Sequence, residues 1–162
     1  MSAEPPDRGN AGKGPGRAQP PAATPALRRA KIMMVDDDTL MTDIVKEYLQ
    51  ESGCAPLVAT NDPVSAEARI RQEKPDLLLL DLMMPERSGF DILEAVRADP
   101  ELKSLPVIVL TAAADAPHRM KALELGAHAV LAKPIEAARL FEQLERQLSS
   151  AQDRASPPPA GA

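Results

Sequence analysis

The stretch Asp76-Leu77-Leu78-Leu79-Leu80-Asp81 decides the fold of this chain. Its four consecutive leucines are typical of a strand buried on both faces, because a half-exposed strand alternates apolar and polar residues. Strands covered on both faces occur in parallel sheets with helices packed above and below. The stretch therefore predicts an α/β domain, and it places the carboxylate of Asp81 at the end of a buried strand.

Apolar runs and helical patterns alternate on both sides of this stretch. The strands are short continuous runs, whereas the helical patterns repeat apolar residues every three or four positions. The pattern predicts five strands, over residues 31–35, 55–60, 77–80, 107–110 and 129–132. It predicts five helices, over residues 39–52, 63–73, 89–98, 115–125 and 135–148. Asp38, Asp62 and Asp115 are expected to cap the helices that follow them.

The two ends of the chain differ in composition from its centre. Residues 1–30 contain six prolines and four glycines, and they offer too little apolar surface to offset the entropy of ordering them. Residues 149–162 include three consecutive prolines. We therefore expect a disordered arm over residues 1–30, one domain over residues 31–148 and a disordered tail over residues 149–162.

Charge and composition exclude several classes of protein. The net charge of −5 divides into +3 for residues 1–30, zero for residues 149–162 and hence −8 for residues 31–148, a domain too acidic to expect nucleic-acid binding. No apolar run approaches the roughly 18 residues of a membrane span, and the N-terminus lacks the apolar stretch of a signal peptide. The single cysteine, Cys54, excludes an internal disulfide and fits a cytoplasmic protein.

Four of the five predicted strands end in polar residues that their apolar runs do not predict. These residues are Asp36 with Asp37, Asp81, Thr111 and Lys133. Open α/β sheets bind ligands at the carboxyl ends of their strands, where the strand order reverses. By analogy with the flavodoxin-like fold, we expect a doubly wound sheet of order 2-1-3-4-5, which brings these side chains to one place.

Three carboxylates in one place need compensating positive charge. Two unit charges about 4 Å apart repel by about 4 kcal/mol at an effective dielectric of about 20. Lys133 supplies one positive charge, and Mg²⁺, which prefers oxygen ligands and readily adds a phosphate oxygen, would supply two. A carboxylate can attack phosphorus and form an acyl phosphate, so Asp81 is the candidate nucleophile. The Thr111 hydroxyl can donate to a phosphoryl oxygen, and the backbone carbonyl of Met83 is a further candidate metal ligand.

Four segments in order carry a family resemblance: Ile32-Met-Met-Val-Asp-Asp-Asp38, Asp81-Leu-Met-Met-Pro-Glu-Arg-Ser-Gly-Phe-Asp91, Val107-Ile-Val-Leu-Thr-Ala112 and Gly126-Ala-His-Ala-Val-Leu-Ala-Lys-Pro134. Together they resemble the receiver domain of two-component response regulators. The resemblance implies that Asp81 is the phosphoacceptor and that Thr111 and Lys133 bind the phosphoryl group. The bond corresponding to Lys133–Pro134 is often cis in this family. The resemblance also implies a Mg²⁺ site formed by Asp37, Asp81 and the carbonyl of Met83, with Asp36 acting directly or through water.

The resemblance implies partners as well. The phosphoryl donor would be a phosphohistidine on a sensor histidine kinase or a histidine phosphotransfer protein. The phosphorylated chain would bind a downstream protein effector or pass the group along a phosphorelay. Such a protein takes part in its own phosphorylation and dephosphorylation but is not a metabolic enzyme. No output domain follows residue 148, so we expect a single-domain regulator without direct DNA binding; the alternative is the receiver part of a larger regulator.

One residue departs from the family pattern. Three positions before its lysine, the family commonly has tyrosine or phenylalanine, whose rotation accompanies movement of the threonine. This chain has Val130 at that position. The usual coupling of threonine to an aromatic side chain is therefore not expected here.

Two other classes of α/β protein share parts of the pattern. A haloacid-dehalogenase-like phosphatase also combines an aspartate nucleophile with threonine, lysine and Mg²⁺, and Asp36-x-Asp38 fits its first motif loosely. That class needs a further acidic pair after the lysine, whereas Glu136, Glu142 and Glu145 fall on an amphipathic helix. A flavodoxin-like cofactor binder needs aromatic residues to stack on a flavin, and the chain has one tyrosine, two phenylalanines and no tryptophan.

Overall fold

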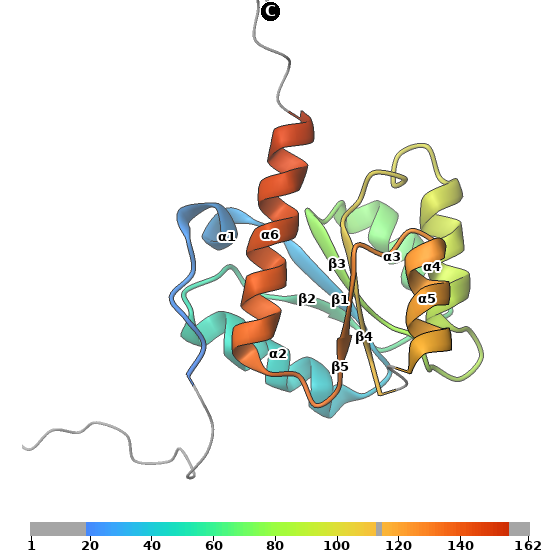
Figure 1. Ribbon diagram of the computed structural model, residues 1–162, viewed down its shortest axis with the longest axis horizontal. Coiled ribbons are helices and arrows are strands. Elements are labelled where there is room, and N and C mark those ends of the chain that lie inside the picture. The colour runs from blue at the N-terminus through green and yellow to red at the C-terminus, as the bar shows by residue number, and fades with distance from the viewer. Residues whose placement is uncertain (1–18, 113–114, 156–162) are drawn as a thin grey trace, which may run out of the picture.

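A computed structural model describes residues 19–112 and 115–155 of the chain. Parallel strands form one five-stranded sheet, and helices cover both of its faces (Figure 1). The strands are β1 (Ile32–Val35), β2 (Val58–Thr60), β3 (Leu77–Asp81), β4 (Val107–Thr111) and β5 (Ala129–Ala132). Their order in the sheet is β2-β1-β3-β4-β5, which confirms the predicted doubly wound fold.

The described residues form six helices, one more than the sequence predicts. They are α1 (Pro25–Arg29), α2 (Thr39–Glu51), α3 (Ala66–Glu73), α4 (Gly89–Ala98), α5 (Ala116–Glu124) and α6 (Ala137–Ala155). Helices α1, α2 and α6 pack on one face of the sheet, and α3, α4 and α5 pack on the other. Within the described ranges, no helix has both the length and the apolar character that a bilayer crossing requires.

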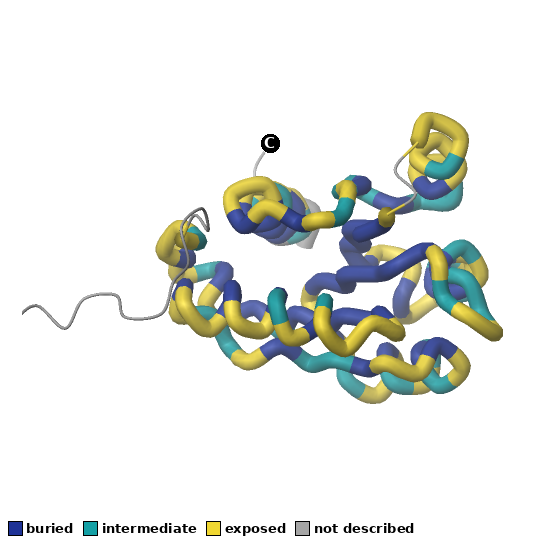
Figure 2. The backbone as a smooth tube through the Cα atoms, turned by 90° about the horizontal axis from the view of Figure 1, so that it is seen from below, coloured by how far each residue is buried: buried dark blue, intermediate teal, exposed yellow. Residues whose placement is uncertain are grey.

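The two cores use alternate residues of the same strands. In β3, Leu77 and Leu79 pack with α1, α2 and α6, whereas Leu78 and Leu80 pack with α3, α4 and α5. Successive side chains of a strand point to opposite faces, so a strand covered on both sides must be apolar throughout. Figure 2 shows buried positions along the strands and exposed positions on the outer sides of the helices.

Two of the three predicted helix caps are confirmed. Asp38 accepts the N–H of the residue two positions on at 3.0 Å, and Asp115 accepts the N–H three positions on at 3.1 Å. The prediction for Asp62 is wrong, because helix α3 begins later, at Ala66, with Ser65 as its N-cap residue. The Asp62 carboxylate instead accepts an N–H two positions on at 3.0 Å, which closes a turn before the helix.

The predicted boundaries of the ordered domain need correction at both ends. Residues 19–30 are not disordered, because they contain α1 and pack against the domain, while residues 1–18 lie outside the described range. Helix α6 runs on to Ala155, past the predicted limit at residue 148. Proline stops a helix, and the first proline after α6 begins is Pro157, so the sequence offers no earlier stop.

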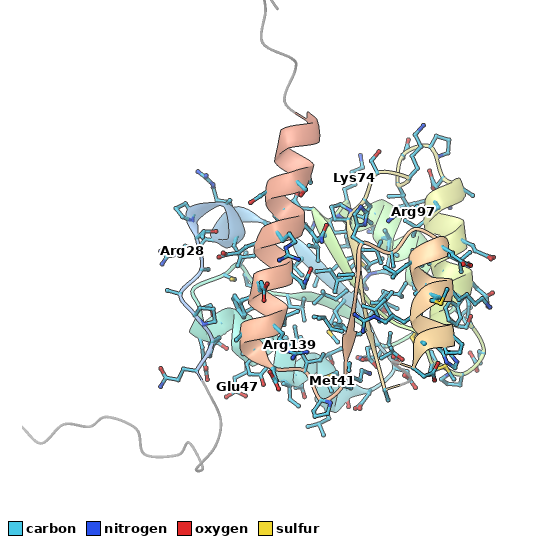
Figure 3. The ribbon with its side chains drawn as sticks, viewed as in Figure 1. Arg28, Met41, Glu47, Lys74, Arg97 and Arg139 are labelled. Atoms are coloured by element: carbon cyan, nitrogen blue, oxygen red, sulfur yellow. The ribbon has the colours of Figure 1, made fainter. Side chains whose placement is uncertain are left out.

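Leu27 anchors the N-terminal segment. Its side chain is fully buried in the core that α2 and α6 form with the sheet. The N–H of Ala23 donates to the carbonyl of Ser52, just after α2, at 3.1 Å. Arg28, labelled in Figure 3 beside α1, donates from Nε to the Ala23 carbonyl at 3.1 Å. One buried leucine and one backbone bond to Ser52 therefore hold against the domain a segment that its composition predicts to be disordered.

Replacing Leu27 by alanine tests this anchor. We expect the free energy of unfolding to fall by about 2–4 kcal/mol, the usual range for a fully buried leucine. Leu40→Ala is the matched control, because that leucine is also helical but 66 % exposed, and it should change stability by less than about 0.5 kcal/mol. Urea denaturation measures both values, and equal effects of the two substitutions would contradict the packing of α1.

Candidate phosphoryl-acceptor site

The carboxyl ends of the strands meet at one edge of the sheet, toward the bottom of Figure 1 where α6 begins. Asp36 directly follows β1, and Asp81 is the last residue of β3. Thr111 is the last residue of β4, and Lys133 directly follows β5. The parallel strand order therefore brings the predicted polar residues to one edge, as expected at a topological switch point.

The ammonium group of Lys133 bridges two of the carboxylates. Its Nζ lies 2.8 Å from an oxygen of Asp36 and 3.4 Å from an oxygen of Asp81. The exposed fractions of the side chains are 0 % for Asp36, 5 % for Asp81 and 14 % for Lys133. Water competes little for charges this buried, so loss of Lys133 would leave two buried carboxylates without a compensating charge.

Asp37 completes a cluster of three carboxylates. One oxygen from each of Asp36, Asp37 and Asp81 lies within 4.8 Å of the other two. Asp37 is exposed, so the cluster opens to solvent on its side. Besides Lys133, nearby groups hold Asp36 in place: its carboxylate accepts the N–H of Asp38 at 2.9 Å, and its backbone carbonyl accepts from Asn61 at 2.7 Å.

The pKa values of the site reflect this crowding. Burial and the neighbouring Asp36 carboxylate raise the pKa of Asp81 from 3.8 to about 6. Lys133 and the N–H of Met83 oppose part of that rise by bonding the Asp81 carboxylate. Burial acts to lower the pKa of Lys133, but its bonds to Asp36 and Asp81 outweigh burial and leave that pKa raised. One ammonium group therefore does not fully compensate the acids around it.

The cluster fits a hard divalent cation. Its donors are carboxylate oxygens, and three ionised acids with one lysine leave a net negative charge that a cation would offset. The open side at Asp37 leaves room for the water molecules and ligand oxygens that Mg²⁺ retains. Met83 lies two residues after Asp81, and its side chain is 57 % exposed. The role of the Met83 carbonyl as a ligand stays a prediction.

Two residues that support the site received no role from the sequence. A Cβ at Gly89 would collide with the backbone carbonyl of Asp81, so only glycine lets the loop after β3 return this closely. Asn61 follows β2, the one strand whose end the sequence analysis left out. Its side-chain amide donates to the carbonyl of Asp36, and its place as a polar residue at a strand end is the signal that could have identified it.

The remaining predicted residues lie along β4 and β5. Thr111 is fully buried, and its backbone carbonyl accepts the N–H of Lys133 at 2.9 Å. The peptide between Lys133 and Pro134 is cis, as the resemblance implies. Val130 is 4 % exposed and packs in the core under α3, α4 and α5, so a buried aliphatic side chain occupies the position of the family's aromatic residue.

The fold and the edge residues define a flavodoxin-like α/β domain with an acid–lysine cluster at its switch point. The family model of the response regulator receiver domain matches residues 32–145. The chain therefore belongs to the response regulator receiver domain family, and the phosphatase and flavin-binding alternatives are set aside. Helix α1 and the last turns of α6 lie outside the matched residues.

Related proteins contain the receiver in different settings. The chain is 34% identical over 119 residues to the chemotaxis protein CheY-3 of Vibrio cholerae, across 74% of this chain and 92% of that protein. It is 38% identical over 114 residues to the transcriptional regulatory protein CpxR of Escherichia coli, across 70% of this chain but 47% of CpxR. It also matches the signal receiver domain of a signal transduction histidine kinase from Syntrophus aciditrophicus, with a TM-score of 0.69 and 27% identity over 81% of this chain and 98% of that one.

Replacing Asp81 by asparagine tests its raised pKa. A carboxyl group whose pKa is higher in the folded state favours folding at low pH, and that contribution is lost as the pH rises through the folded value. The values of 3.8 and about 6 mean that ionised Asp81 opposes folding at neutral pH. Without divalent cations, we expect Asp81→Asn to be more stable than the native chain by about 1–3 kcal/mol near pH 7.5, with the gain shrinking toward about pH 4. Urea denaturation at both pH values measures the gain, and a gain independent of pH would show that the charge is not its source.

Proposed function

We propose that this receiver domain accepts a phosphoryl group on Asp81 from a phosphohistidine and then signals through protein contacts. The observation that carries the proposal is the position of Lys133, which bonds both Asp36 and Asp81 at the switch-point edge. A largely buried ammonium group beside the attacking carboxylate would also lie close to the oxygens of a phosphoryl group that reacts there, on which negative charge develops during transfer. Membership of the receiver family supports the same chemistry.

In the proposed step, an oxygen of the Asp81 carboxylate attacks the phosphorus, and the bond from phosphorus to the donor imidazole nitrogen breaks. The nitrogen keeps the electron pair of that bond, and protonation of the imidazole makes the leaving group neutral histidine. A pKa of about 6 leaves Asp81 mostly ionised near neutral pH and more basic than an ordinary aspartate. The attacking group is therefore available in the form that the reaction needs.

Lys133 and Thr111 stabilise the phosphoryl group in this proposal. After phosphorylation, the negative charge of the Asp81 carboxylate lies on the phosphoryl oxygens. The Lys133 ammonium then moves toward those oxygens. The Thr111 hydroxyl donates to another phosphoryl oxygen. A bound Mg²⁺, held by Asp36, Asp37, Asp81 and the Met83 carbonyl, would neutralise charge on the transferred oxygens.

The donor is proposed to be a sensor histidine kinase or a histidine phosphotransfer protein. Three exposed apolar side chains support docking of a protein next to the acid cluster. Leu40 follows β1, Val64 follows β2 and Met83 follows β3, and their exposed fractions are 66 %, 58 % and 57 %. All three residues lie in segments that begin at the carboxyl edge of the sheet, where the acid cluster lies, and a docking protein would bury apolar surface there.

The output is proposed to be a protein effector or the next carrier of a phosphorelay. The charge of −8 over residues 31–148 supports a protein rather than DNA as the direct partner. The related proteins are named a chemotaxis protein in one case and a transcriptional regulatory protein in the other, so both kinds of output occur among relatives. A cytoplasmic location is proposed to follow from the phosphohistidine donor.

Labelling with radioactive acetyl phosphate tests the acceptor. With Mg²⁺ present, we expect the native chain to take up label and Asp81→Asn to take up less than about a tenth as much, because the variant lacks the nucleophile. Asp43→Asn removes an exposed acid on α2 and is the control that should label normally. Label on Asp36 in the Asp81→Asn variant would contradict the assignment.

Thermal denaturation tests the cation. A dissociation constant of about 1 mM would make about 10 mM Mg²⁺ stabilise the folded domain by about 1.4 kcal/mol, which raises Tm by several degrees. Asp37→Asn should lose most of this rise, because it removes one of the three carboxylates. Asp38→Asn keeps a good helix cap and should retain most of the rise. A native Tm that does not respond to Mg²⁺ would contradict the metal site.

A further inference from the structure

The loop between β3 and α4 carries Met83 and contains a backbone conformation that needs support. Glu86 has a φ of 68°, in the left-handed region that residues other than glycine rarely adopt. Such conformations persist only where the surrounding structure holds them. The position of Met83 therefore depends on contacts that fix this loop.

The two ends of the loop are fixed by local contacts. The N–H of Gly89 donates to the carbonyl of Leu82 at 2.9 Å, which closes the loop at its base. Ser88 and Asp91 form a capping box at the start of α4. Met84 packs against the core beneath the loop. These contacts hold the base of the loop, and within the strained turn the N–H of Arg87 donates to the carbonyl of Pro85 at 2.7 Å.

Arg87 ties that turn to a different element, helix α3. Its guanidinium lies 2.8 Å from one oxygen of Glu67, and the other oxygen of Glu67 lies 3.0 Å from Arg71. The exposed fractions are 26 % for Arg87 and 24 % for Glu67, but 52 % for Arg71. Water screens the bond to Arg87 less than the bond to Arg71. Because Arg87 directly follows Glu86, the bridge holds the chain at the point of strain.

We propose that the Arg87–Glu67 ion pair positions the loop that carries Met83 and thereby sets the affinity of the acid cluster for Mg²⁺. The inference rests on the metal site of the proposed function. Both side chains are positioning residues, since they act through the backbone of the loop and not as ligands. Groups that orient metal ligands typically affect metal affinity when they are replaced.

An effect of charge alone and an effect of loop positioning predict different changes in Mg²⁺ affinity. Removing the positive charge of Arg87 near a cation site would strengthen Mg²⁺ binding by electrostatics, and removing the negative charge of Glu67 would weaken it. Positioning predicts that both Arg87→Gln and Glu67→Gln weaken binding, because each breaks the same bridge. The two explanations therefore differ in the direction of the Arg87 effect.

Titration calorimetry of the full chain with Mg²⁺ distinguishes them. We expect the dissociation constant to rise about three- to tenfold in Arg87→Gln and in Glu67→Gln. Arg71→Gln is the matched control, because it removes the other arginine bound to Glu67, which belongs to α3 and not to the loop, and its constant should stay within about twofold of native. Arg87→Lys keeps the charge and should recover most of the native affinity.

The outcomes separate this inference from the proposed function. Native or tighter Mg²⁺ binding by Arg87→Gln overturns the positioning role while leaving the metal site intact. Failure of the native chain to bind Mg²⁺ overturns the metal site and the inference together. Circular dichroism of each variant without Mg²⁺ verifies that the fold is retained. A weakened Arg87→Gln that Arg87→Lys restores, beside an unchanged Arg71→Gln, supports the inference.

Discussion

The bond between Lys133 and Asp36 joins groups 97 positions apart in the sequence and ties the end of β5 to the end of β1. Asp81, at the end of β3, shares the same lysine. Buried acids at neighbouring strand ends repel each other, and apolar packing on the two faces of the sheet supplies no positive charge. Lys133 therefore offsets part of this repulsion and links the ends of β1, β3 and β5.

The positive charge of Lys133 does not fully offset the carboxylates around it, and this imbalance bears on the function of the site. The pKa of Asp81 stays raised to about 6 although Lys133 is in contact with it. An amide at this position would fold without that penalty, so the carboxylate opposes stability where it lies. A residue that lowers stability in this way is typical of a catalytic or binding site and not of a packed core. A cation would then bind at a site whose negative charge is not yet balanced.

The sequence predicted what depends on short-range pattern and missed what depends on single tertiary contacts. The leucines of β3 predicted the sheet, since burial on both faces leaves a continuous apolar run, and strand-end polarity predicted the edge residues. Leu27 was missed because one buried side chain outweighs the proline-rich composition around it. The cap at Asp62 failed because the same carboxylate can close a turn or cap a helix, and the sequence does not distinguish the two. The Arg87–Glu67 bridge was invisible because it joins two elements whose approach only the fold determines.

Val130 changes how a phosphoryl group on Asp81 would be sensed. A buried valine has no ring to swing, so movement of Thr111 cannot be passed on by rotation of an aromatic side chain. The backbone offers another connection, because the Thr111 carbonyl accepts the N–H of Lys133 and Thr111 pairs in register with Ala132 of β5. If phosphorylation draws the Lys133 ammonium from the acids to the phosphoryl oxygens, the pull acts on a residue bonded directly to both β4 and β5. The Lys133 ammonium, which links the strand ends, would then also transmit the phosphorylation of Asp81 to β4 and β5.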